Sequence, residues 1–171
     1  MTRPAWRRLA RWRVPLGFLS AGAAFWLAHP TPGSLAAGLA VALPGELLRV
    51  WAAGHIVKGR EITTSGPYRF VRHPLYLGST ILGAGFAIAA YSWPVAALVA
   101  AYLGLTLLAA VRTEEATLDD RFDGAYSRYR DGRFDGENRP FAWQRVAGNR
   151  EHRTVLGFLI LASLLAAKTA W

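Results

Sequence analysis

The sequence contains no cysteine. This absence excludes disulfide bonds, thiolate nucleophiles and thiolate metal ligands, and it leaves the redox compartment of the protein undetermined. Acidic residues are also scarce, because 11 Asp and Glu stand against 20 Lys and Arg, a formal net charge of +9. The 171 residues are enough for one domain.

Long apolar runs separate the charged blocks of the chain. The runs cover residues 14–29, 35–51, 74–90, 95–111 and 154–171. Such segregation of charge is typical of a chain whose solvent is lipid. A signal peptide would explain only the first run, so we predict a single all-α integral membrane domain, 1–171, with about five transmembrane helices. The runs have about 16–18 residues, the lower edge of the spanning range, so one of them can be re-entrant.

Basic residues mark one side of this arrangement. The turns 30–34 and 91–94 contain no Lys or Arg, whereas the N-terminus and the connectors 55–73 and 112–153 carry nearly all of them. The positive-inside rule therefore predicts a cytoplasmic N-terminus and a cytoplasmic active face in a bacterial or archaeal plasma membrane. Nucleic-acid binding is disfavoured, because it needs a folded basic face with exposed aromatic residues.

Two regions outside this simple pattern carry their own predictions. Glu46 and Arg49 lie one helical turn apart within the second run, which indicates a structural ion pair or snorkelling side chains. Apart from them no ionisable residue lies deep in a run, which disfavours a transporter. The apolar spacing in 113–130 predicts a cytoplasmic amphipathic helix at the membrane surface. Residues 131–149 contain Gly, Asn and Pro and are predicted to form a loop.

Polar motifs gather on the predicted cytoplasmic side. They are Ser65-Gly66-Pro67-Tyr68, Arg72-His73-Pro74-Leu75-Tyr76-Leu77-Gly78, Arg112-Thr113-Glu114-Glu115 and the Tyr126/Tyr129 pair. Each motif alone has a structural explanation. A His before Pro can cap a helix, a Glu pair can be solvated at the interface, and Tyr side chains anchor helices at headgroups. The functional interpretation depends on their order and their common side.

Together these motifs resemble the isoprenylcysteine carboxyl methyltransferase family and its phospholipid methyltransferase relatives. The resemblance covers residues 55–141. It implies S-adenosylmethionine as the cofactor, held by a membrane-embedded site and covered by the C-terminal segment. Gly83-Ala84-Gly85 lies inside an apolar run with no strand before it, so it is not a dinucleotide fingerprint.

The resemblance also implies which residues contact the cofactor. They are Arg60, Glu61, Ile62 and Thr63 through their backbone, together with Tyr68, His73, Pro74, Leu75, Tyr76 and Glu114. The Glu114 carboxylate suits the cofactor's ammonium group, His73 or a nearby Arg suits its carboxylate, and the two tyrosines suit its adenosine. No metal site is predicted.

The residues expected to face the methyl acceptor are Arg112 and Glu115. In the family an Arg lies further before the acidic pair, where this chain has Ala110, so Arg130 or Arg133 are alternatives to Arg112. Glu115 is available as a base.

The predicted function is S-adenosylmethionine-dependent methylation of a lipophilic acceptor that enters from the bilayer. Carboxyl O-methylation of an isoprenylcysteine-type substrate is the first choice. The alternatives are N-methylation of a phospholipid headgroup amine, S-methylation of a thiol, and a non-enzymatic membrane assembly or lipid-binding protein.

Overall fold

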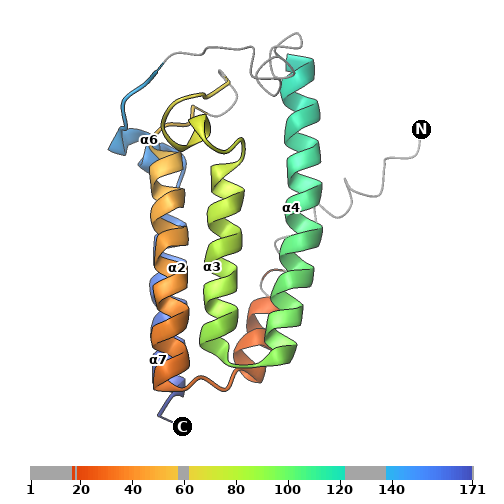
Figure 1. Ribbon diagram of the computed structural model, residues 1–171, viewed down its shortest axis with the longest axis vertical. Coiled ribbons are helices and arrows are strands. Elements are labelled where there is room, and N and C mark those ends of the chain that lie inside the picture. Colours follow the sequence, from red (N-terminus) through yellow and green to blue (C-terminus); the bar gives the residue numbers. More distant parts are fainter. Residues whose placement is uncertain (1–16, 18, 58–61, 122–137, 171) are drawn as a thin grey trace, which may run out of the picture.

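The computed structural model describes residues 17, 19–57, 62–121 and 138–170, and all regular structure within them is helical. The all-α prediction is therefore confirmed. Residues 19–27 are helical. The other elements are α2 (Pro32–Ala53), the 3-10 helix η1 (Gly66–Arg69), α3 (Pro74–Ala90), α4 (Trp93–Arg121), α6 (Trp143–Gly148) and α7 (His152–Lys168). The long helices run up and down beside one another (Figure 1).

Helix boundaries follow local capping chemistry. The prediction for α3 is confirmed at both ends, whereas α2 begins at Pro32 instead of residue 35. The Thr31 side chain accepts a 3.1 Å hydrogen bond from the Ser34 amide, and Ser34 Oγ accepts one of 2.9 Å from the Thr31 amide. This capping box, with Pro32 in the first turn, extends the helix into the predicted 30–34 turn. Likewise α4 begins at Trp93, within the predicted 91–94 turn.

The segment after the fourth apolar run agrees in part with prediction. Helix α4 continues without interruption to Arg121 and so includes the first part of the segment 113–130, which was predicted to be helical. The loop predicted for 131–149 is wrong where α6 forms, at Trp143–Gly148. Residues 122–130, with Tyr126 and Tyr129, lie outside the described residues, as do Arg60, Glu61, Arg130 and Arg133.

Small residues bring α2 and α3 into close antiparallel contact. A Cβ atom on Gly38 would lie 2.5 Å from both the Ala89 amide nitrogen and the Gly85 carbonyl oxygen. One on Gly45 would lie 2.8 Å from the carbonyl oxygen of Gly78. Only the absence of a side chain allows the two backbones to approach in this way.

The outer surfaces of the helices are strongly apolar. The segments Pro32–Ala53 and Trp93–Glu115 are long and apolar enough to cross a membrane, with mean hydropathies of 1.4 and 2.1. The 22 residues of α2 extend about 33 Å at about 1.5 Å per residue, close to the thickness of the hydrocarbon layer. Leu105, Leu108 and Leu156 are all more than half exposed. Lipid, unlike water, solvates such a surface at no cost, so the fold fits a membrane protein. The number of crossings stays a prediction.

One end of the bundle collects the polar connections. Residues 55–57, 62–73 and α6 lie there, together with the carboxyl end of α4, and we call this region the polar end (Figure 1). The short turns at 28–31 and 91–92 lie at the opposite end. The described parts of the connectors 55–73 and 112–153 therefore lie at the same end of the bundle. The assignment of that side to the cytoplasm stays a prediction.

Candidate functional site

The first residues of α3 place two side chains toward α4. His73 is the N-cap of α3 and Pro74, which is fully buried, begins the first turn. The His73 side chain makes no capping hydrogen bond, so helix capping does not explain this residue. Its Nε2 atom lies 3.1 Å from Glu115 Oε1 instead.

A second contact between the same helices lies one turn further along α3. The Tyr76 hydroxyl donates a 2.7 Å hydrogen bond to Glu114 Oε2. The rings of His73 and Tyr76 are 5.6 Å apart, so the two contacts form one group. We call His73, Tyr76, Glu114 and Glu115 the α3–α4 cluster. The side chains of His73 and Glu115 are 19% and 32% exposed, which leaves the cluster accessible from outside the bundle.

Tyr68 belongs to the Ser-Gly turn before α3. Gly66 has φ +59°, a left-handed conformation that glycine adopts without strain. The ring of His55 packs directly on Gly66, where a Cβ atom would lie 2.6 Å from three ring atoms. Tyr68 is 7% exposed and lies in η1. The turn is therefore held against the end of α2.

Sequence reasoning missed His55. Its Nδ1 lies 3.0 Å from the Trp51 carbonyl oxygen, which can only accept, so Nδ1 carries the hydrogen. The available signal was a histidine directly after Gly54, because His side chains near helix ends often bond the last carbonyl groups.

The remaining predicted residues have different positions. Ile62 and Thr63 are partly buried in irregular chain before η1, and Thr63 Oγ1 is buried without a hydrogen-bond partner among the described residues. The Leu75 carbonyl accepts a hydrogen bond from Arg49. Arg112 is exposed, and it lies about 200° around α4 from Glu114 because a helix turns about 100° per residue. Its side chain therefore leaves α4 on a different face from the Tyr76 contact.

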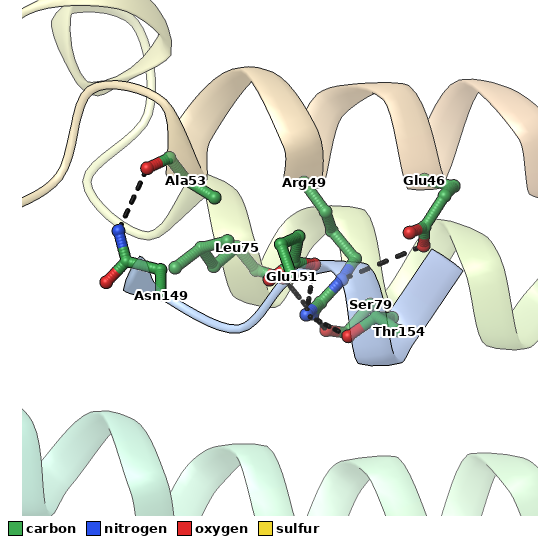
Figure 2. A network of polar contacts seen from close by, with 8 residues as sticks. All are labelled: Glu46, Arg49, Ala53, Leu75, Ser79, Asn149, Glu151 and Thr154. Carbon is green, nitrogen blue, oxygen red and sulfur yellow. Dashed lines mark hydrogen bonds and ion pairs between the residues drawn. The ribbon is translucent and has the colours of Figure 1, made fainter. Parts of the chain in front are cut away.

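A buried ionic network lies beside the start of α3. The predicted pairing of Glu46 with Arg49 is confirmed at 3.9 Å, but Glu151 is the closer partner of Arg49, at 2.6 Å (Figure 2). No motif in the sequence points to Glu151, which follows Arg49 by about a hundred residues and lies in the predicted connector 112–153.

The short helix α6 closes the carboxyl end of α2. Arg145 Nε donates a 2.7 Å hydrogen bond to the Gly54 carbonyl, and Asn149 Nδ2 donates to those of Ala53 and Ile56 at 2.9 and 3.1 Å. These bonds satisfy carbonyl groups that a helix end leaves without partners. Phe141, just before α6, lies 5.9 Å from the His55 ring. The C-terminal segment is thus fixed next to the Ser-Gly turn.

The stretch of sequence that forms the Ser-Gly turn and the α3–α4 cluster matches a known protein family. The family model for phospholipid methyltransferases matches residues 48–124. Residues 48–124 are therefore similar to the phospholipid methyltransferase family, and we call them the methyltransferase-family segment. The match confirms the resemblance drawn from the motifs and includes the Ser-Gly turn and the whole α3–α4 cluster. The similarity covers less than half of the 171 residues.

The alignment with one curated relative is longer than this methyltransferase-family segment. The chain is 30% identical over 125 residues to the cobalt-zinc-cadmium resistance protein CzcN of Cupriavidus metallidurans. The alignment covers 67% of this chain and 56% of the relative, so the chain spans little more than half of that protein. No solved structure matches the chain significantly.

Proposed function

We propose that this protein is an S-adenosylmethionine-dependent methyltransferase that acts on a lipophilic acceptor in the membrane. The observation that carries the proposal is the α3–α4 cluster: two hydrogen-bonded contacts, Tyr76 with Glu114 and His73 with Glu115, inside the methyltransferase-family segment. These contacts bring four polar side chains together at one end of an apolar bundle, where a ligand with charged groups could bind.

The chemistry of these residues fits the proposed cofactor. Two carboxylates lie beside a phenol and an imidazole, which suits a ligand with an ammonium group and a carboxylate. The buried Thr63 Oγ1 needs a partner, because a buried polar atom without one is costly. It lies in the stretch that the family resemblance assigns to cofactor contacts. When bound, the cofactor supplies a methyl group on a positively charged sulfur.

The residues of this chain then have positioning roles. Glu114 would hold the ammonium group, His73 the carboxylate, and Tyr68 and Tyr76 the adenosine. Methyl transfer from a sulfonium is an in-line displacement: the acceptor atom forms a bond to the methyl carbon as the sulfur–carbon bond breaks. The protein accelerates such a step chiefly by aligning the reactants and excluding water.

The apolar surroundings support a lipophilic acceptor. A cavity of about 210 Å³ lies between helix 19–27, α3, α4 and α7, with an apolar lining that includes Phe25, Phe86 and Leu103. Such a cavity suits a hydrocarbon chain, so we propose that the acceptor enters laterally from the bilayer.

Carboxyl O-methylation of an isoprenylcysteine-type substrate is the reaction that the resemblance implies. In that reaction Arg112 would orient the carboxylate, a role that stays a prediction. The contact of His73 with Glu115 favours a second candidate, N-methylation of a phospholipid headgroup amine. An amine releases a proton on methylation, and in this reaction the Glu115 carboxylate would accept it.

The test is calorimetric binding of S-adenosylhomocysteine to the full chain in detergent, followed by labelled methyl transfer to a prenylcysteine analogue and to phosphatidylethanolamine. We expect binding by the unaltered protein and its loss in the double variant Glu114→Ala/His73→Ala. Thr117→Ala, an exposed change on the same helix, is the matched control and should bind normally.

Two outcomes would contradict the proposal. Equal affinity in the double variant and the unaltered protein would remove the α3–α4 cluster from the site. The absence of any binding would favour the non-enzymatic alternative, a membrane assembly or lipid-binding protein, and the relative's name describes a resistance protein and not an enzyme.

A further inference from the structure

A buried ion pair links two helices that are distant in sequence. Arg49 on α2 and Glu151, the residue before α7, have side chains only 15% and 6% exposed, and their charged atoms are 2.6 Å apart. Figure 2 shows the Arg49 guanidinium group between α2, α3 and α7. Removing two charges from water is costly, and apolar residues of similar size often give equal or greater stability. The pair therefore calls for an explanation other than stability.

The same guanidinium group also bonds to the start of α3. Its Nη1 donates to the Leu75 carbonyl at 3.2 Å and to the Ser79 hydroxyl, and its Nη2 donates to Thr154 Oγ1 at 3.2 Å. One side chain thus joins α2, α3 and α7. A planar guanidinium can serve such divergent acceptors, whereas a lysine ammonium is a single point charge.

The bonded part of α3 is the part that carries the proposed site. Leu75 directly precedes Tyr76, and its carbonyl belongs to the first turn after His73. The side chains of His73 and Tyr76 must meet Glu115 and Glu114 on α4 to form the α3–α4 cluster. A displacement of this turn would lengthen both contacts, so the position of α3 at this point decides whether the cluster forms.

Glu46 provides an internal comparison. Its carboxylate is buried and lies 3.9 Å from Arg49 Nε, but both residues are on α2, one turn apart. The Glu46–Arg49 contact therefore joins no second helix, whereas the Glu151–Arg49 contact does.

We propose that Arg49 and Glu151 are positioning residues of the methyltransferase site: their ion pair fixes the first turn of α3 so that His73 and Tyr76 meet Glu114 and Glu115. The inference rests on the proposed function. It assigns to the start of α7 a role in cofactor binding through Arg49, although Glu151 touches no cofactor itself.

The experiment compares Glu151→Gln, Arg49→Lys and the control Glu46→Gln in the full chain. The thermal midpoint of unfolding is measured for each variant. The affinity for S-adenosylhomocysteine per folded molecule is then measured at a temperature well below that midpoint. We expect about tenfold or greater loss of affinity in the first two variants, because each breaks the buried ion pair, and a change within about twofold in the control.

A purely structural pair would give a different result. It would lower the thermal midpoint while folded Glu151→Gln molecules bound with unchanged affinity, and that result would overturn the inference. If either variant does not fold, Ser79→Ala decides instead, because it removes one acceptor of Arg49 and keeps a good helix former. We expect about threefold to tenfold weaker binding, and unchanged affinity would overturn the inference. Absence of binding by the unaltered protein would overturn the proposed function, and this inference with it.

Discussion

Tyr76 and Glu114, 38 residues apart, are joined by a 2.7 Å hydrogen bond from phenol to carboxylate. This bond is the shorter of the two contacts between α3 and α4 in the cluster, and both contacts lie at the polar end of the bundle. Together with the His73–Glu115 contact, the bond sets how the two family motifs face each other.

Removal of the Tyr76 hydroxyl group tests the hydrogen bond to Glu114 most directly. Tyr76→Phe keeps the ring and deletes the donor to Glu114. We expect about tenfold weaker binding of S-adenosylhomocysteine by calorimetry, because hydrogen bonds to charged groups contribute about 1.5–3 kcal/mol. Tyr91→Phe, an exposed tyrosine at the other end of α3, is the control and should bind as the unaltered protein does. A loss of equal size in both variants would argue against a local role for Tyr76.

Gly66 should tolerate no side chain. Gly66→Ala places a Cβ atom against the His55 ring and holds a non-glycine residue at φ +59°. We expect destabilisation of about 1–3 kcal/mol, seen as a lower thermal midpoint, and weaker cofactor binding because the turn carries Tyr68. Gly104→Ala is the matched control, since a Cβ there meets no atom within 4 Å and alanine favours a helix. A normal midpoint for Gly66→Ala would show that the turn relaxes.

The glycine contact between α2 and α3 gives a prediction about packing alone. Gly38→Ala puts a Cβ atom 2.5 Å from backbone atoms of α3, which cannot move like a flexible side chain. We expect a loss of about 1–3 kcal/mol in the free energy of unfolding, measured in detergent by thermal or denaturant unfolding. Gly157→Ala on α7 has open space and should be neutral or stabilising. Equal stability of the two variants would contradict the close packing.

The sidedness of the bundle is testable because the chain has no cysteine of its own. Phe70→Cys lies at the polar end and Trp93→Cys at the opposite end, and both positions are exposed. An impermeant maleimide should label residue 93 in intact cells and residue 70 only in inverted vesicles, as the positive-inside rule requires. Labelling of both residues from the same side would refute the predicted crossing of α3.

Local signals explain which parts of the fold were predictable. The ends of α3 follow from Pro74 at its first turn and from Tyr91, whose left-handed conformation ends it after 17 residues. Helix α6 was missed because Gly, Asn and Pro around it indicate a loop. Its formation depends on the bonds of Arg145 and Asn149 to carbonyl groups more than 90 residues earlier.

The candidate site was predictable as a group but not as pairs. The motifs indicated that His73, Tyr76 and Glu114 share one end of the bundle, and the structure brings them together. Which glutamate meets which partner depends on the rotation of α4, since neighbours on a helix point about 100° apart. Glu151 and His55 carried no such motif, because their roles arise only from tertiary contacts.

The bonds of α6 to α2 have a consequence for biosynthesis. Arg145 and Asn149 leave the ribosome long after the α2–α3 hairpin, so the carbonyl groups of Ala53, Gly54 and Ile56 keep water as their partner until the last helix is inserted. We expect a nascent chain that ends at Arg121 to integrate into the bilayer yet retain no nucleoside ligand. Retention of S-adenosylhomocysteine by ribosome-bound chains of that length would show that maturation does not wait for the final segment.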